Sequence, residues 1–121
     1  MTSLITLSCH MVAALCVTLF DAASYAASPG KEALMITIGH EPGGSAAIHR
    51  HKAHVFVYVP EGAIKMQVKN QPEVTLKAGQ TFYETPKDIH VVGKNASVPE
   101  SAMFLVFLIK KTVAPPVLPV K

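Results

Sequence analysis

The sequence predicts an all-β fold, and three observations support this. Short apolar runs rich in Val, Ile, Phe, Tyr and Thr recur at roughly the 8–12-residue spacing that is typical of sandwiches and barrels. Between or at the ends of these runs lie the Gly, Pro, Asn and Asp residues that favour tight turns. After Pro29 no apolar run keeps a helical period long enough to predict a helix.

Seven segments have the composition of strands. They are Ala33–Gly39, His54–Val59, Ile64–Lys69, Glu73–Gly79, Gln80–Thr85, His90–Asn95 and Ala102–Lys111. The last is apolar on consecutive residues, so we expect it to be central and covered on both faces. The tail that follows it contains three prolines, which cannot donate ladder hydrogen bonds. We expect the tail to form an extended edge or to cross to a neighbouring subunit.

The amino-terminal segment differs from the rest of the chain. An apolar run, Leu4–Phe20, is followed by the small residues of Asp21–Ser28. This order is typical of a secretory signal peptide with an apolar helix, so we assign residues 1–27 to a signal peptide and residues 28–121 to one domain. No Lys or Arg precedes Lys31, and His10 interrupts the run. An uncleaved anchor and a part of the folded domain therefore remain alternatives.

Cleavage at this point determines what the mature protein contains. Its roughly 94 residues would have no cysteine, because Cys9 and Cys16 both lie in the leader, so disulfide and thiol chemistry are excluded. The net charge of +3 would become +4 with the loss of Asp21. The basic residues are scattered, which gives no support to nucleic-acid binding. We expect a periplasmic or secreted protein with no stable membrane insertion after cleavage.

Three histidines lie close together in the sequence. His49 and His51 are two residues apart, so on a strand their side chains point to the same face. Such a pair is a common beginning of a Zn, Fe, Mn, Ni or Cu site, although a solvated pair on a strand face is the alternative. His54 points away from the interior if Val55 points inward, and only a bulge would reverse this. We expect His54 to lie on the surface.

Two sequence blocks contain the histidines. In the first, Gly43 precedes His49 by five intervening residues and a turn at Pro60-Glu61-Gly62 closes the following strand. In the second, His90 follows Gly79 after ten intervening residues. These blocks resemble the two motifs of the cupin superfamily, over residues 33–111. The resemblance implies a small double-stranded β-helix, or jelly-roll barrel, that in many members holds a divalent metal.

Transferred residue by residue, the resemblance makes His49, His51 and His90 metal ligands. The position of the family's glutamate ligand is occupied by Val55, which cannot coordinate a cation. The implied site has three histidines and open positions, as in the three-histidine cupin dioxygenases, which would imply Fe(II). Mn, Ni, Cu and Zn remain alternatives. The missing carboxylate favours an anionic ligand and weakens metal affinity, so a metal-free cupin also remains an alternative.

The second motif departs from the family at three positions. Thr85 and Lys87 replace its proline and glycine, and lysine lacks the conformational freedom of glycine. Asn95 lies one residue beyond the family's asparagine, and we expect it to be a turn residue. Of Tyr83 and Glu84, alternation sends only one inward, and neither is predicted to be a ligand.

Alternation also predicts an apolar pocket around the metal, which would suit a small, partly hydrophobic ligand. The expected lining is Val55, Val57, Val59, either Met66 or Gln67, and either Phe104 with Val106 or Leu105 with Phe107. The alternative is that these side chains fill the barrel.

Three functions fit these features. The first is a metal-dependent oxygenase, lyase or isomerase acting on a small organic molecule. The second is a non-catalytic module that binds or senses a small ligand. The third is a structural or oligomerising domain, and because cupins often dimerise, a homodimer is a candidate assembly. No catalytic residue is identified, since His54, Tyr83 and Glu84 are candidates by position alone.

Overall fold

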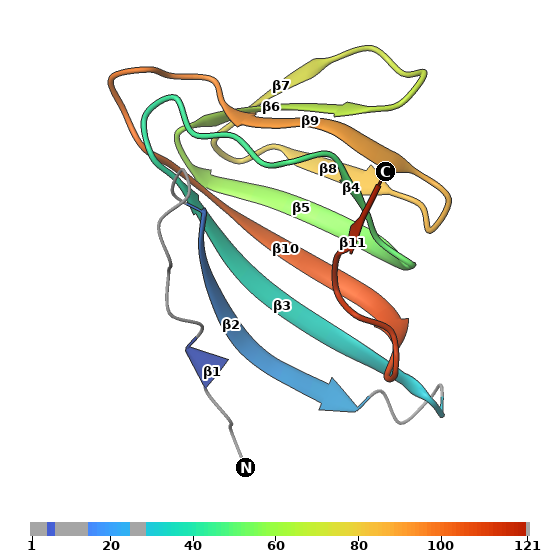
Figure 1. The fold of residues 1–121 in the computed structure, drawn as a ribbon. Coiled ribbons are helices and arrows are strands. Elements are labelled where there is room, and N and C mark those ends of the chain that lie inside the picture. Colours follow the sequence, from blue (N-terminus) through green and yellow to red (C-terminus); the bar gives the residue numbers. More distant parts are fainter. Residues whose placement is uncertain (1–4, 7–14, 25–28, 121) are drawn as a thin grey trace.

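The chain folds as two antiparallel sheets that face each other (Figure 1). The computed structural model describes residues 5–6, 15–24 and 29–120, with side chains from residue 29 onward. All regular elements among these residues are strands. The all-β prediction is therefore confirmed.

The strands of the domain follow the predicted segments closely. They are β3 (Lys31–His40), β4 (His49–Arg50), β5 (Ala53–Glu61), β6 (Ala63–Val68), β7 (Val74–Lys77), β8 (Thr81–Glu84), β9 (Ile89–Asn95), β10 (Ala102–Lys111) and β11 (Leu118–Pro119). Each of the seven predicted segments corresponds to one of them, and β4 and β11 are additional short strands.

The larger sheet has the order β1-β2-β3-β10-β5-β8, in which β1 is Ile5–Thr6 and β2 is Leu15–Ser24. Strand β10 lies between β3 and β5, which confirms its central position. The prediction that β10 is covered on both faces is wrong, because only alternate residues, such as Phe104 and Leu108, are buried. The intervening residues, such as Leu105 and Phe107, lie half-buried on the outer face of the sheet.

The smaller sheet has the order β11-β4-β9-β6-β7. The carboxyl-terminal tail forms its edge strand β11, as one of the two sequence alternatives predicted. Before β9, Lys87 occupies the glycine position of the family turn without a positive φ. The Asp88 carboxylate accepts a hydrogen bond of 2.7 Å from the Thr85 backbone N–H and closes this turn instead.

The apolar leader does not have the predicted helical conformation where the structure describes it. Strand β2 (Leu15–Ser24) pairs with β3, and β1 (Ile5–Thr6) pairs with β2. The helix prediction is therefore wrong for Leu15–Ser24, a stretch in which Val, Thr and Phe favour an extended chain next to an available sheet edge. Residues 25–28, at the predicted end of the signal peptide, lie outside the described residues. No helix within the described ranges could span a membrane.

The core lies between the two sheets and is formed by alternate residues. Val55, Val57 and Val59 point inward from β5, while Ile64 and Met66 point inward from β6. Each of these side chains is at most 2% exposed. Because of this alternation, one face of every long strand packs against the other sheet. A cavity lies between the sheets where some of the inward-facing residues are polar.

Candidate functional site

A cavity of about 530 Å³ lies among inward-facing residues of both sheets and the tail. Its apolar lining includes most of the residues predicted for it: Val55, Val57, Met66, Phe104 and Val106. Val59 is buried but does not reach the cavity. The polar side chains on its wall are His40, His49, His51, Glu84 and His90.

The three predicted histidines come together at this cavity. His49 on β4 pairs directly with His90 on β9, and their ring centroids are 4.8 Å apart. The rings of His49 and His51 are 4.9 Å apart. The structure therefore brings the three residues together, although their role as metal ligands remains a prediction.

Two of these rings are oriented by backbone carbonyls. The Nδ1–H of His49 donates to the carbonyl of Ala47 at 2.8 Å, and the Nδ1–H of His51 donates to that of Pro116 at 2.6 Å. A neutral ring that donates through Nδ1 has its lone pair on Nε2. This is the arrangement in which outer residues usually hold a metal-ligating histidine.

Glu84 is a site residue that the sequence reasoning missed. It lies on β8 directly opposite Val55 of β5, on the same inward face, and is 2% exposed. Its Oε1 is 3.1 Å from His90 Nδ1, and its Oε2 is 3.9 Å from His51 Nε2. A carboxylate thus reaches the histidines from the neighbouring strand, across from the position at which the family pattern has glutamate.

Burial determines the protonation of this group. It lowers the pKa of His90 to about 4, with the charge of His49 as a second cause, and it also lowers the pKa of His51. Burial, with the nearby charge of Asp88, raises the pKa of Glu84 to about 7. At neutral pH, His51 and His90 therefore keep neutral rings, the form that can coordinate a metal.

The donor set fits a divalent metal chemically, because imidazole and carboxylate together suit Mn, Fe, Ni, Cu and Zn. His90 Nε2 and Glu84 Oε1 are buried and make no hydrogen bond to any described residue. As placed, however, no three His, Cys, Asp or Glu side chains of the described ranges form a group that could hold an ion. Metal binding therefore requires rotation of side chains around the cavity.

Gly93 provides the space for the His90 ring. A Cβ placed on Gly93 would lie 3.2 Å from both Cε1 and Nε2 of His90. Any larger residue at position 93 would therefore push the His90 imidazole away from its present position.

The carboxyl-terminal tail closes one side of the cavity. Pro116, Val117 and Pro119 contribute to the wall, and β11 pairs with β4 next to His49. The tail is held at its base by Lys110, which is 5% exposed, forms an ion pair with Glu32 and donates to the carbonyl of Ala114 at 2.7 Å. The tail thus connects the larger sheet to the smaller one beside the histidines (Figure 1).

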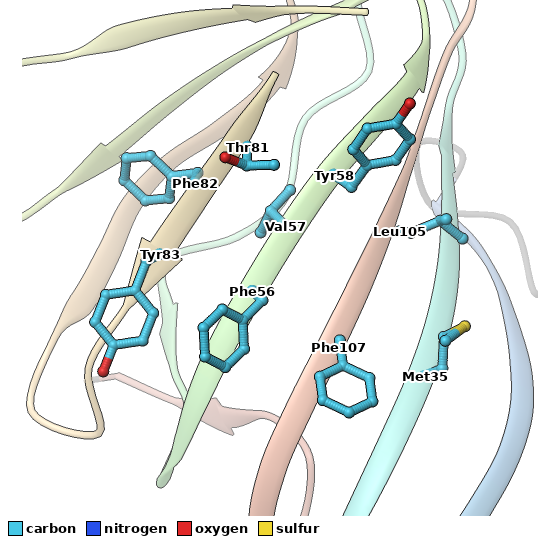
Figure 2. A pocket seen from close by; sticks show the side chains of 9 residues that line it. All are labelled: Met35, Phe56, Val57, Tyr58, Thr81, Phe82, Tyr83, Leu105 and Phe107. Carbon is cyan, nitrogen blue, oxygen red and sulfur yellow. The ribbon is translucent and has the colours of Figure 1, made fainter. Parts of the chain in front are cut away.

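His54 lies outside this site, as predicted. It is exposed on β5, and its Nδ1 is 2.6 Å from the hydroxyl of Tyr83. Figure 2 shows the adjoining groove on the outer face of the larger sheet, where Phe56, Tyr83 and Phe107 project from three neighbouring strands. His49, His51 and His90 do not line this groove.

The buried titratable groups predict that acid destabilises the metal-free protein. His40, His51 and His90 have lowered pKa values, so the stability they contribute is present above pH 6.5 and is lost as the pH falls toward 4. Glu84 acts in the opposite direction, because its raised pKa favours the folded state below pH 7. The shifts of His90 and Glu84 are similar in size and opposite in effect, so His40 and His51 decide the balance, and the urea midpoint with EDTA should be lower at pH 5 than at pH 7.5.

The Glu84→Gln variant separates these contributions. It removes the opposing carboxyl group, so the loss of stability on acidification should become larger. His54→Gln serves as a surface control and should follow the wild-type profile. A urea midpoint that is unchanged or higher at pH 5 in the wild-type protein would contradict this assignment.

Comparisons with known proteins agree with this architecture. A family model described as a cupin domain matches residues 37–107. A search of curated proteins found no match to the sequence. Solved structures that resemble the chain include an uncharacterized conserved protein with a double-stranded β-helix domain from Klebsiella pneumoniae. Its TM-score is 0.67 and its identity 21%, with 89% of this chain and 86% of that one covered.

Several structural neighbours have names that describe an activity, and two of them are a lyase and a cyclase. One is the DMSP lyase DddQ from Ruegeria pomeroyi, with a TM-score of 0.63 and 17% identity over 71% of this chain and 42% of the lyase. The other is the polyketide cyclase RemF from Streptomyces resistomycificus, with a TM-score of 0.63 and 20% identity over 87% of this chain and 71% of the cyclase. The present chain thus spans less than half the length of the lyase. At these identities the similarity shows a shared fold.

Proposed function

The chain belongs to the cupin family, and on this premise we propose that it binds a divalent metal and acts on a small organic molecule in its cavity. The proposed ligands are the three histidines His49, His51 and His90 and the carboxylate of Glu84. The observation that carries the proposal is the position of Glu84, within 3.1 Å of His90 and 3.9 Å of His51. It replaces the negative charge that Val55 cannot supply.

The residues around this centre have separable roles. The carbonyls of Ala47 and Pro116 hold two imidazoles with Nε2 available, and the apolar walls exclude water from the ligand. A bound metal would supply a Lewis acid for an oxygen atom of the organic molecule. A lyase and a cyclase among the structural neighbours support an enzyme of the oxygenase, lyase or isomerase type. Separately, we propose that the protein is exported, because the sequence of Leu4–Phe20 is typical of a signal peptide.

A second candidate is a cupin that binds a small ligand without a metal. It is favoured by the present side-chain arrangement, in which no group of described residues could hold an ion and Glu84 already contacts His90. The two candidates differ in metal retention, because the apolar cavity serves both.

Metal titration tests the proposal. Protein is first stripped with EDTA and then incubated with each ion in turn. After desalting it should retain about one equivalent of at least one of Mn(II), Fe(II), Ni(II), Cu(II) or Zn(II), as measured by plasma mass spectrometry. Failure to retain more than roughly a tenth of an equivalent of any of these ions would overturn the proposal in favour of metal-free binding.

A swap of two facing residues tests the carboxylate. Glu84→Val should weaken metal binding at least about tenfold, because a charged ligand is lost. Adding Val55→Glu should restore binding, since residues 55 and 84 face each other across β5 and β8 and the swap keeps the same side chains. Equal metal affinity in the wild-type and Glu84→Val proteins would show that Glu84 is not a ligand.

A further inference from the structure

His40, at the end of β3, is a buried polar residue that the proposed metal centre does not use. It is 1% exposed and lines the same cavity. Neither Nδ1 nor Nε2 has a hydrogen-bond partner among the described residues. A buried polar group without a partner destabilises the folded state, and such groups are rare in folded proteins. An imidazole with both nitrogens open to a cavity therefore indicates a partner that enters the cavity.

The surroundings hold this ring in place. It stacks on Phe104, with ring centroids 5.4 Å apart and planes 28° from parallel. A Cβ added to Gly44 would lie 3.4 Å from its Nδ1. The backbone after His40 is also fixed, because the Asn95 side-chain amide donates to the carbonyls of Glu41 and Glu100 at 3.0 and 2.6 Å. Asn95, which we expected to be a turn residue, therefore braces the segment that carries His40.

His40 enters the cavity at a different level from Glu84. Along β10, the residue opposite His40 is Ala102, whereas the residue opposite Val55, and hence level with Glu84, is Leu108. Six residues of β10 separate these backbone positions, but the side chains converge in the cavity, since His40 is close enough to His90 to contribute to the lowering of its pKa. The cavity wall also includes the apolar residues Ile36, Ile38 and Val106. A molecule that contacts His40 and the other histidines therefore needs only a short apolar part between its two polar groups.

The chemistry of His40 restricts the group that it can bind. Burial lowers its pKa, so the ring is neutral near pH 7 and has one N–H donor and one acceptor nitrogen. This combination matches a hydroxyl or carbonyl oxygen better than a carboxylate, which would prefer a charged donor.

We propose that His40 recognises a neutral hydroxyl or carbonyl oxygen of the cavity's ligand. The ligand class is then a small, mainly apolar acid with its anionic group toward His49, His51 and His90 and its neutral oxygen toward His40. The position of the anionic group rests on the proposed metal-dependent function, whereas the contact with His40 does not.

Three matched pairs of acids serve as probes, and each pair differs only by a hydroxyl group. They are 4-hydroxybenzoate and benzoate, 4-hydroxyphenylacetate and phenylacetate, and 3-(4-hydroxyphenyl)propionate and 3-phenylpropionate. Calorimetric titration should show that at least one hydroxylated acid binds about tenfold more tightly than its counterpart, as for sites built to bind a hydroxyl. The increasing length of the acids varies the distance between the carboxylate and the hydroxyl group.

Substitution of His40 then identifies the source of this preference. His40→Leu has a similar volume without nitrogen atoms, so it should reduce the affinity ratio to about one and leave the des-hydroxy acid bound as before. His40→Gln, which keeps a donor and an acceptor, should retain part of the preference and provides a second variant if His40→Leu does not fold. The surface substitution His54→Leu should keep the full ratio.

Two results would overturn the inference: no hydroxyl preference in any pair with the wild-type protein, or an unchanged preference in a folded His40→Leu or His40→Gln variant. Loss of bound zinc in His40→Leu would also overturn it, because His40 would then be a metal ligand. Titrations with and without zinc separate this inference from the proposed function. A His40-dependent preference in a protein that binds no metal would reject the metal centre alone, and zinc binding without any preference would reject the role of His40 alone.

Discussion

Replacement of His49, His51 or His90 by alanine is expected to abolish stable metal retention. Loss of an outer residue that only orients a metal ligand typically weakens binding 10–100-fold, so loss of the ligand itself should weaken it by more than about 100-fold. His49 and His90 pair directly across β4 and β9, with their ring centroids 4.8 Å apart. The measurement is the metal content of each variant after desalting, together with zinc affinity from competition with a chelator.

His54→Ala is the matched control for this prediction. His54 lies only three residues from His51 in the sequence, but its ring is on the outer face beside Tyr83. The variant should keep wild-type metal content and affinity. If His54→Ala loses metal as completely as His49→Ala does, or if His49→Ala keeps it, the assignment of ligands by their position on the inner face is wrong. Far-UV circular dichroism establishes that each variant is folded.

Local alternation explains why much of the cavity was predictable. Once His49 was assigned to the interior, the two-residue period placed Val55 and Val57 inward and His54 outward without knowledge of the sheet. The same rule left a choice between Phe104 and Leu105, because β10 is apolar at consecutive residues. Only packing against the other sheet decided that Phe104 faces inward.

Glu84 and His40 depend on long-range relations that the sequence does not contain. Alternation admitted Glu84 or Tyr83 to the interior, but the register that sets Glu84 opposite Val55 is determined by pairing between β5 and β8. His40 belongs to neither motif, and its burial depends on stacking against Phe104 and on the brace at Asn95. The leader helix was predicted from an apolar run followed by small residues, a pattern that does not by itself separate a helix from a sheet strand such as Leu15–Ser24.

The turn that closes the first motif predicts a large stability difference between two glycine substitutions. Gly62 and Gly79 have similar positive φ values of 79° and 89°. A Cβ on Gly79 would meet nothing within 4 Å, whereas a Cβ on Gly62 would lie 2.8 Å from the Cβ and 2.9 Å from the Cα of Ala102. Both alanine variants have the cost of a left-handed backbone, about 1–2 kcal/mol. Gly62→Ala adds an overpacking cost of about 1–3 kcal/mol, since β10 begins at Ala102 and its backbone must shift.

Urea unfolding of the two variants measures this difference, because the backbone cost is shared and the contact with Ala102 is not. Gly62→Ala should lower the free energy of unfolding by about 1–3 kcal/mol more than Gly79→Ala does. Adding Ala102→Gly to Gly62→Ala should recover part of that difference, since it removes the nearest atom while the Cα of residue 102 remains close. Equal losses in the two single variants would mean that the start of β10 moves freely. In that case the turn at Gly62 would not fix the register of the strand that carries Phe104 and Val106 into the cavity.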